Sequence, residues 1–292
     1  MSANDQLAER FEAARPRLHA LAYRMLGARG EVDDALQETW LRLARSDATV
    51  IENLDGWLTT VLGRVCLNAL RARRSRREEP LHEQAMPELI VTSPTATDPE
   101  HEALLAEAVG VALLVVLETL SPAERVAFVL HDMFAVPFEE LARMLDRSPD
   151  ATRQLASRAR RRVRGTPVPD PDRSRQREVV DAFFAAARGG NLEALVALLD
   201  PQVVLRADWG PGRKAQRLEG PQRVVNAARV GAARGLDLLP VLVNGAAGAL
   251  SLDGGAPFAV MAFTVVDERI VAIDVLADPD RLAVLDLDAL RG

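Results

Sequence analysis

Two runs of arginine give this chain side chains suited to binding nucleic acid. The first run follows Asp55 and contains no acidic residue from Gly56 to Arg77. Its members are Arg64, Arg71, Arg73, Arg74, Arg76 and Arg77. Guanidinium groups bind phosphate oxygens and guanine edges. A single basic helix face is common among soluble proteins. The first run indicates nucleic-acid binding only because the chain contains a second such run.

The second run closes a candidate recognition helix. Arginine forms good hydrogen bonds with guanine, and glutamine forms them with adenine. Serine can hydrogen-bond to either base. The helical pattern leaves five such side chains outward: Arg153, Gln154, Ser157, Arg158 and Arg161. The arginines from Arg160 to Arg164 can contact phosphates. The alternative to a DNA-binding helix is a solvent-exposed charged helix in an unrelated helical bundle.

Side chains for catalysis or metal binding are scarce. The single cysteine, Cys66, excludes an internal disulfide, and one thiol among four scattered histidines cannot make a structural zinc site. All four histidines and the only tyrosine precede residue 132. In the C-terminal part, Asp208 beside Trp209 is the candidate acid if burial raises its pKa; the alternative is a strand-end carboxylate that caps a turn. We therefore predict no catalytic residue, no metal and no cofactor.

Helical periodicity positions both arginine runs at helix ends. Apolar residues at three- and four-residue steps predict helices over 6–25, 31–44, 55–77 and 102–120. Ser121-Pro122-Ala123-Glu124 has the form of a capping box. Two short helices, 137–145 and 149–164, joined by a tight turn, predict a helix-turn-helix.

The C-terminal part has a different pattern. Strand-like runs occur at 202–207, 239–243, 249–252, 258–266 and 270–276, after or between helical stretches at 176–188, 191–199 and 221–233. Helices followed by antiparallel strands indicate an α+β domain.

Charge divides the chain along the same boundaries. Residues 1–77 carry +3, 78–109 carry −8, 110–165 carry +2 and 166–292 carry −3, which gives the net −6. The total excludes a globally basic DNA coat. We predict domains at 1–77, 110–165 and 174–292, joined by linkers at 78–109 and 166–173.

Residues 5–165 resemble the sigma factors of the extracytoplasmic-function class. The matching phrases are EVDDALQETWLRL, WLTTVLGRVCLNALRARR and LSPAERVAFVLHDMFAVPFEELARMLDRSPDATRQLASRARRRV. The resemblance implies all-α sigma domains: a promoter-melting domain of three to four helices and a helix-turn-helix domain. It also implies an alternative sigma factor that binds core RNA polymerase and directs promoter-specific transcription initiation.

The same resemblance assigns residue roles. Asp33, Asp34 and Gln37 would face the clamp helices of the polymerase beta-prime subunit. The −10 element would meet Arg64, Asn68, Arg71 and Arg74. The −35 element would meet Arg153, Gln154, Ser157, Arg158 and Arg161. The expected partners are these clamp helices, the beta flap and promoter DNA.

Residues 174–290 resemble the SnoaL-like domain, an NTF2-like cone, that is fused to one group of these sigma factors, the sigma J type. That group carries phrases similar to WLPEP in the linker, DGGGK in the tail and NPD near the end. The corresponding residues here are Met86-Pro87-Glu88-Leu89, Asp208 to Lys214 and Asp278-Pro279-Asp280. The resemblance implies a regulatory contact made by Pro87, Glu88, Asp208, Trp209, Lys214, Asp278, Pro279 and Asp280. It also implies modulation in cis by the tail and allows a small-molecule ligand in the cone.

Two other functions fit parts of the sequence. A stand-alone DNA-binding regulator with a ligand-sensing cone would bind its operator tightly without polymerase, whereas a net-negative sigma factor would bind promoter DNA poorly alone. An isomerase or hydrolase in the tail would lose turnover when Asp208 is changed.

The expected location is the cytoplasm, without membrane contact. The longest apolar run, 109–117, is about half of the ~20 residues that a span requires. The first twenty residues alternate charged and apolar side chains and offer no signal-peptide core.

Overall fold

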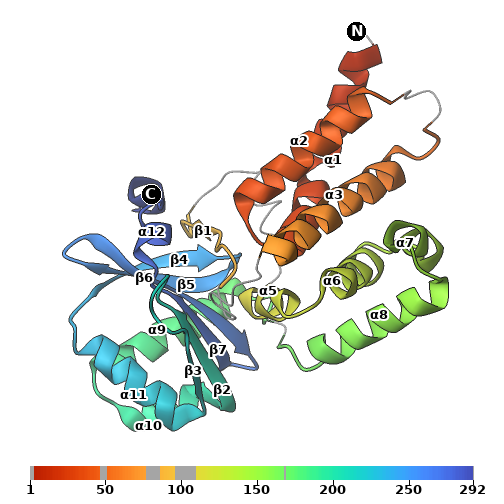
Figure 1. Cartoon of the computed structure of the whole chain (residues 1–292). Helices are drawn as coiled ribbons and strands as arrows, with labels where there is room; N and C mark the ends of the chain where they lie inside the picture. The colour runs from red at the N-terminus through yellow and green to blue at the C-terminus, as the bar shows by residue number, and fades with distance from the viewer. Residues whose placement is uncertain (1–2, 47–50, 77–85, 96–109, 168, 292) are drawn as a thin grey trace. The chain divides into compact units, whose positions relative to one another are not determined.

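The computed structural model describes residues 3–46, 51–76, 86–95, 110–167 and 169–291 (Figure 1). The chain divides into two compact units. Of the described elements, one unit holds α1, α2, α3, α6, η2, α7, α8 and all of α5 except its first three residues. The other holds those three residues, the described linker residues 86–95 and the chain from Thr166 onward. Within the described residues, no helix is long and apolar enough to cross a membrane.

Three long helices form the first part of the helical unit: α1 (Ala3–Leu26), α2 (Arg29–Ala44) and α3 (Leu54–Arg76). Their apolar stripes face one another, and Leu18, Leu36 and Leu62 are at most 2% exposed. Burial of such side chains contributes about 1.5–3 kcal/mol each. These are the three helices that the sequence predicts.

The second part of this unit contains a helix-turn-helix. Its elements are α5 (Val111–Glu118), α6 (Pro122–Phe128), a π-helical turn η2 (Val129–Met133), α7 (Phe138–Leu145) and α8 (Pro149–Val163). Ser121 and Glu124 form the predicted capping box. Asp146 ends α7 in the left-handed region, with φ 53°, which turns the chain sharply into α8. The π-helical turn was not predicted, and residues 102–109 of the helix expected over 102–120 lie outside the described residues.

Direct packing joins the two helical parts. Arg125 on α6 is 3% exposed, and its Nη1 donates to the carbonyl oxygen of Met25 at 2.8 Å. On α3, a Cβ at Gly63 would lie 2.8 Å from the end of the Leu130 side chain, so α3 packs closely against the helix-turn-helix part at this glycine. The three long helices and the helix-turn-helix part therefore pack together in one unit.

The second unit is an α+β domain, as predicted. Its sheet has the order β1-β4-β5-β6-β7-β2-β3, and every neighbouring pair is antiparallel except β2 and β7. The strands are β1 (Val91–Thr92), β2 (Leu199–Asp208), β3 (Gln216–Glu219), β4 (Asp237–Val243), β5 (Ala246–Asp253), β6 (Ala256–Val266) and β7 (Arg269–Leu276). Three helices pack against it, α9 (Arg173–Arg188), α10 (Leu192–Leu198) and α11 (Pro221–Ala232), and two short ones, α12 (Pro279–Leu282) and α13 (Leu287–Arg291), end the chain.

Two of these strands were not predicted. β3 pairs with β2, and β1 comes from the linker and pairs with β4, as Val91 with Val243 and Thr92 with Leu242. A two-residue strand carries no alternation that could reveal it, because its pairing depends on an edge distant in sequence. The described linker thus belongs to the sheet of the C-terminal unit.

The faces of the sheet differ in polarity. Residues Val203, Leu205, Ala207 and Ile273 face the helices and join an apolar core with Phe183 and Phe263. The intervening residues point the other way, and there Arg206 pairs with the fully buried Asp274 at 2.6 Å and 3.0 Å. This alternation decides which side chains of β2 reach the linker and which reach the interior.

Candidate functional site

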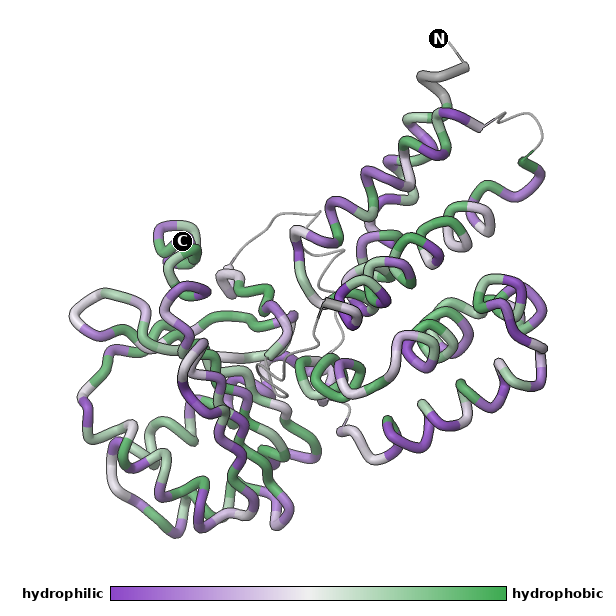
Figure 2. Tube along the Cα trace, in the orientation of Figure 1, coloured by the Kyte–Doolittle hydropathy of each residue, from purple (hydrophilic) through white to green (hydrophobic). Residues whose placement is uncertain are grey.

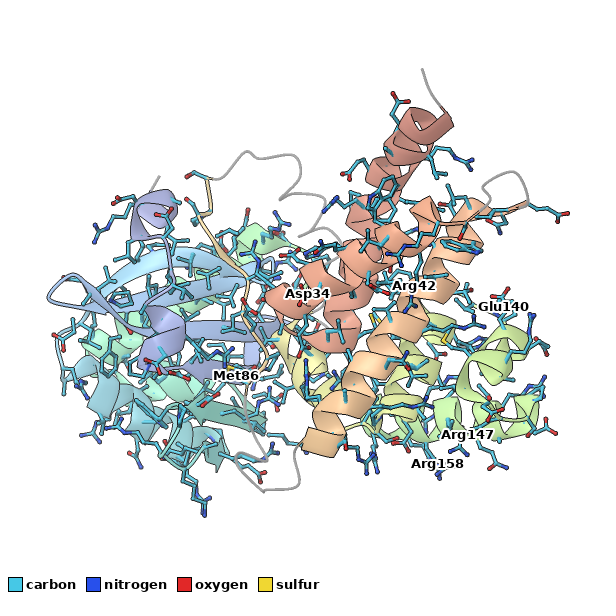
Figure 3. The ribbon with its side chains drawn as sticks, turned by 45° about the horizontal axis from the view of Figure 1, so that its top comes forward. Asp34, Arg42, Met86, Glu140, Arg147 and Arg158 are labelled. Atoms are coloured by element: carbon cyan, nitrogen blue, oxygen red, sulfur yellow. The ribbon has the colours of Figure 1, made fainter. Side chains whose placement is uncertain are left out.

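The predicted recognition helix α8 presents one polar and one apolar face. Arg153, Gln154, Ser157, Arg158 and Arg161 are all exposed, whereas Thr152, Leu155, Ala156 and Ala159 are buried. Figure 2 shows the alternation of hydrophilic and hydrophobic positions along this helix, and Figure 3 shows Arg158 projecting from it. Ser148 accepts a hydrogen bond from Ala151 N–H at 3.2 Å and so caps the helix N-terminus. The cap fixes where the polar face begins.

Arg153 is held by side chains from both helices of the motif. It pairs with Asp150 at 2.6 Å and with Glu139 at 3.2 Å, and its guanidinium lies 5.6 Å from the centre of the Phe138 ring. These partners are surface groups, so the ion pairs are weak and exchangeable. Arg153 can leave them for a nucleic-acid acceptor at small cost.

A second polar face runs along α3. Arg64, Asn68, Arg71 and Arg74 are exposed and recur at steps of four, three and three residues, which places them on one side of the helix. Arg73 belongs to the same arginine run but is half-buried. It pairs with Glu31 and donates to the carbonyl oxygen of Leu26 at 2.9 Å. The run therefore divides into DNA-facing candidates and an arginine that fixes α3 to α1 and α2.

Two aspartates and a glutamine of α2 form a third exposed set. Asp33, Asp34 and Gln37 are exposed, while Val32 and Leu36 on the same helix are buried. Asp34 is labelled in Figure 3. The arrangement gives a negative patch that can approach a basic partner.

In the C-terminal unit, Asp208 and Arg281 hold the linker. Asp208 Oδ2 accepts from the backbone N–H of Met86 at 3.0 Å and from Arg281 Nη1 at 3.4 Å. Arg281 in turn donates to the carbonyl oxygen of Met86 at 2.8 Å and to that of Pro87 at 2.6 Å. The backbone N–H of the buried Met86 and the carbonyl groups of Met86 and Pro87 are thus hydrogen-bonded by charged side chains.

A second contact lies four residues further along the linker. Asn244 Oδ1 accepts from Ile90 N–H at 2.8 Å, and Asn244 N–H donates to the Ile90 carbonyl at 2.8 Å. Asn244 and Gly245 both have positive φ, as a type I′ turn requires between β4 and β5. We call Asp208, Arg281 and Asn244 the linker clamp.

The other predicted regulatory residues have varied surroundings. Pro87 is buried and Glu88 half-buried, whereas Pro279 and Asp280 are exposed at the start of α12. Asp278 caps that helix by accepting from Asp280 N–H at 3.0 Å. Lys214 is exposed, and among the described residues no hydrogen bond or ion pair joins it to the linker.

Asp208 also caps its own turn, because Oδ1 accepts from Gly210 N–H at 3.0 Å. Gly210 has φ 82°, and a Cβ there would lie 2.7 Å from Asp278 Cγ. The Asp208 turn and the Asp278 turn therefore pack face to face, and glycine is required between them.

Sequence reasoning missed two of the three clamp residues. For Asn244 a signal existed, because Asn-Gly between two strand-like runs is a strong indication of a hairpin. For Arg281 the sequence offers only its place after Asp278-Pro279-Asp280. Its role depends on a linker that is 194 residues away in sequence.

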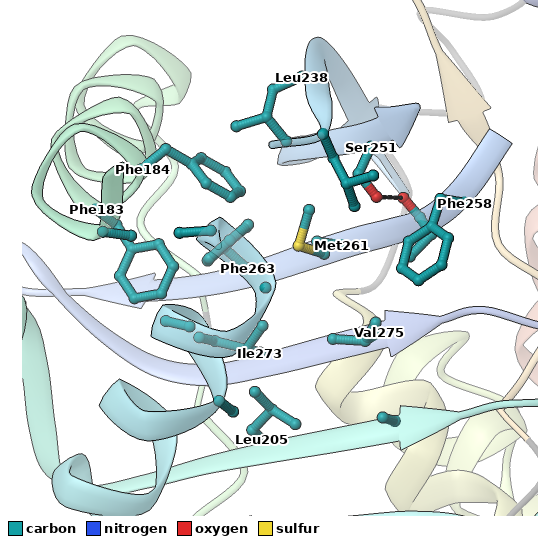
Figure 4. A pocket seen from close by; sticks show the side chains of 18 of the residues that line it. Phe183, Phe184, Leu205, Leu238, Ser251, Phe258, Met261, Phe263, Ile273 and Val275 are labelled. Atoms are coloured by element: carbon teal, nitrogen blue, oxygen red, sulfur yellow. Dashed lines mark hydrogen bonds between the residues drawn. The ribbon is translucent and has the colours of Figure 1, made fainter. Parts of the chain in front are cut away.

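The helices and the sheet of the C-terminal unit enclose a cavity of about 220 Å³ (Figure 4). Its walls come from α9, β2, α11 and strands β3 to β7. Aromatic and aliphatic side chains dominate, including Phe184, Trp209, Phe258 and Met261. Its polar lining consists of Arg188, Gln216, Ser251 and the indole of Trp209. Among the described residues that line it, none is Asp, Glu, His, Cys, Lys or Tyr.

Comparison with known proteins gives matches along most of the chain. Residues 10–76 match the family Sigma-70 region 2, and residues 110–163 match Sigma-70, region 4. The "ECF RNA polymerase sigma factor SigJ" of Mycobacterium tuberculosis is 41% identical over 289 residues, which cover 93% of this chain and 91% of SigJ. The "Probable ECF RNA polymerase sigma factor SigI" of the same organism is 33% identical and covers 97% of both chains. A crystal structure of M. tuberculosis SigJ is 37% identical, with a TM-score of 0.75 over 94% of this chain and 97% of that one.

Proposed function

The chain belongs to the extracytoplasmic-function (ECF) RNA polymerase sigma factors, and from that premise we propose which of its surfaces recognise promoters and which regulate it. Its function is that of an alternative sigma factor in transcription initiation. Sigma factors bind core RNA polymerase and promoter DNA, so each partner needs a surface on the helical unit. Because both partners are cytoplasmic in bacteria, the chain works in the cytoplasm.

Three exposed faces are assigned to these partners. The acidic face of α2 (Asp33, Asp34 and Gln37) binds the clamp helices of the polymerase beta-prime subunit. The α3 face contacts the −10 element through Arg64, Asn68, Arg71 and Arg74, next to a strand that melting displaces. The α8 face contacts the −35 element through Arg153, Gln154, Ser157, Arg158 and Arg161. A recognition helix places its outward N-terminal side chains at base edges of the major groove, which supports this assignment.

The C-terminal unit regulates the sigma domains in cis. The observation that carries this proposal is the linker clamp, which ties residues 86–92 to the sheet of the tail. The linker connects the two DNA-reading domains, so once their direct packing opens, its free length limits how far apart they can move. When the clamp holds those residues, fewer remain free to span −10 and −35 sites.

Run-off transcription tests this regulation. The full chain is combined with core RNA polymerase on a promoter identified by sequencing transcripts after overexpression. Arg281→Ala removes the side chain that donates to Met86 and Pro87, and we expect a several-fold change in transcript. Arg217→Ala is the matched control, because Arg217 is exposed on β3 and pairs with Glu219. Equal transcript from Arg281→Ala, Arg217→Ala and the parent chain would exclude regulation through the clamp.

A gel-shift comparison separates the sigma factor from a stand-alone regulator. We expect a specific promoter complex with core polymerase present and weak binding by the chain alone, since its net charge is −6. Tight, specific binding without polymerase would instead favour the regulator.

The tail acts as a regulatory and not a catalytic domain. Proton transfer needs a side chain that titrates within reach of the reacting group, and the described cavity walls provide no carboxylate, imidazole, thiol or phenol. Asp208 lies on β2 between Ala207 and Trp209, which line the cavity, and its carboxylate is bonded to the linker instead.

A further inference from the structure

The cavity in the C-terminal unit has the features of a ligand site. Its volume of about 220 Å³ exceeds that of the ~150 Å³ apolar cavity known to bind benzene. Side chains that point into it from the sheet, such as Met261 and Val275, remain half-buried although their strand neighbours are fully buried. Protein interiors are closely packed, so the side chains that line a cavity of this size lack many of the van der Waals contacts that they would otherwise make. A ligand of one to two rings would supply these contacts.

The shape of the cavity follows from the residues of α11. This helix presents Ala227, Ala228, Gly231 and Ala232 toward the sheet, opposite Phe183, Phe184 and Phe263. The three phenylalanine rings contact one another edge to face, with centroids 5.6 Å apart, which fixes one wall (Figure 4). An aromatic ligand can stack or pack edgewise on such a wall.

The charged side chains at the described cavity walls are arginines, so the charge there is positive. Arg188 is the charged side chain in the described lining, and it is exposed at the end of α9. Two further arginines lie over lining aromatics: Arg213 at 5.8 Å from the Trp209 ring centre and Arg234 at 4.4 Å from that of Phe258. The hydroxyl of Ser251 is already engaged, since it donates to the Ala259 carbonyl at 3.1 Å. The remaining polar groups of the described lining are the neutral Gln216 amide and Trp209 indole and the positive Arg188, so the charged group favours a ligand with an anionic end.

The cavity is connected to the linker clamp through β2. Leu205, Ala207 and Trp209 face the cavity, while the adjacent Asp208 faces the linker and accepts from Met86 N–H. A ligand that contacts the Trp209 ring therefore acts on the residue next to Asp208, at the end of the strand that positions this carboxylate. β4 gives a second connection, because Leu238 lines the cavity and the same strand pairs with β1 of the linker.

From these observations we propose that the cavity binds a small amphiphilic anion, with an aromatic or aliphatic body and one carboxylate-like end, and that its occupancy changes how firmly the clamp holds the linker. The second half of this proposal rests on the proposed cis regulation; the first half stands without it. Binding and clamping are then linked, and each must alter the other by the same factor.

Calorimetry on the full chain with three probes of one shape tests the binding site. We expect naphthalene-2-carboxylate to bind at least ten times more tightly than 2-naphthylmethylammonium, with 2-naphthylmethanol between them. Arg188→Glu should reverse the order of the two charged probes. Failure of all three probes to bind, or an unchanged order in Arg188→Glu, would overturn the assigned ligand class.

Filling the cavity gives the control for location. Ala228→Phe places a ring in the cavity and should abolish binding of naphthalene-2-carboxylate, whereas Asn226→Phe on the exposed side of α11 should not. If Ala228→Phe fails to fold, Ala232→Leu replaces it. Undiminished binding in a folded cavity-filling variant would place the probe elsewhere and refute the site.

Arg281→Ala tests the coupling. Linkage predicts that this variant shifts the dissociation constant of naphthalene-2-carboxylate by about 5-fold or more, the lower end of typical couplings. An unchanged constant refutes the coupling even if the probe binds. Transcription by Arg281→Ala without probe reports separately on cis regulation, so failure of either idea can be told from failure of the other.

Discussion

Burial divides the arginines of this chain into exposed residues, which include those proposed to contact DNA, and buried structural residues. Arg64, Arg71 and Arg158 are exposed on helix faces, where a guanidinium can find phosphate or guanine. Arg125 is 3% exposed, and its guanidinium donates hydrogen bonds to the carbonyl oxygens of Met25 and Leu117 and to the carboxylate of Glu118. Sequence spacing predicts the first group, because those residues fall outside the apolar stripe. It cannot predict the second, because the burial of Arg125 depends on packing against α1, where the Met25 carbonyl that accepts from it lies 100 residues away in the sequence.

Cys66 provides a residue-scale prediction. It is the only cysteine, fully buried on α3, and burial raises the pKa of its thiol to about 12. The thiolate is the reactive form, so the native protein should react with Ellman's reagent at least a hundred times more slowly than the unfolded chain. The reaction is followed by absorbance across a urea series. A native-state rate close to that of a free thiol would contradict the buried position.

The pair of Arg206 and Asp274 gives a pH-dependent prediction. Burial raises the pKa of Asp274, and Arg206 opposes that rise. Arg206→Met removes the opposing charge and leaves a carboxyl with no exposure, which should destabilise the protein by about 3 kcal/mol at pH 8.

The sign of the pH effect follows from linkage. In the variant the folded-state pKa of Asp274 lies further above the unfolded value, so folding favours the protonated form and the deficit shrinks as pH falls through the folded-state pKa. Urea unfolding of Arg206→Met and the parent at pH 5 and pH 8 measures this. A deficit that grows at pH 5 would show that Asp274 is not the group responsible.

At the scale of elements, the spacing of apolar residues predicts helices and strands whose pattern lies within their own residues. The helices of the sigma part and strands β4 to β7 follow from apolar spacing, and the Ser121 capping box follows from four consecutive residues. β1 and β3 do not, since each is a short edge strand whose partner is chosen by the completed sheet. Arg281 and Asn244 of the linker clamp are missed for the same reason, because they contact linker residues more than 150 positions away in the sequence.

Along α8 the position of an arginine predicts what its loss does. Arg158 lies within the outward face assigned to base edges, so Arg158→Ala should weaken promoter binding of the holoenzyme by about 1–3 kcal/mol at one −35 position and relax specificity there. Arg161 lies one turn later, toward the phosphates; Arg161→Ala should weaken binding to all sequences and lower the salt slope by about 1. Fluorescence anisotropy with promoter variants at several salt concentrations measures both. Arg229→Ala, on the exposed face of α11, is the control, and equal sequence-independent losses for both α8 variants would refute the division.

For the whole molecule, the division into two units does not follow the order of the sequence. Residues 86–95 precede the helix-turn-helix, yet they group with the C-terminal unit. The chain therefore passes from the sigma part into the tail's sheet and back before the tail itself is reached. In this way a tail that follows the last sigma helix binds the linker between the two sigma domains, although the tail does not lie between them in the sequence.

Hydrogen exchange of the linker measures this arrangement directly. In the full chain, the N–H groups of Met86 and Ile90 are bonded to the side chains of Asp208 and Asn244, and β1 pairs with β4, so these amides should exchange slowly. Arg281→Ala removes two bonds to linker carbonyls and exposes Asp208 to water, which should raise the exchange rate at residues 86–90 at least tenfold while β5 and β6 remain protected. Arg217→Ala should leave both regions unchanged. Rapid exchange of residues 86–92 in the parent chain would mean that the linker is not held by the tail, and regulation through the linker clamp would then fail with it.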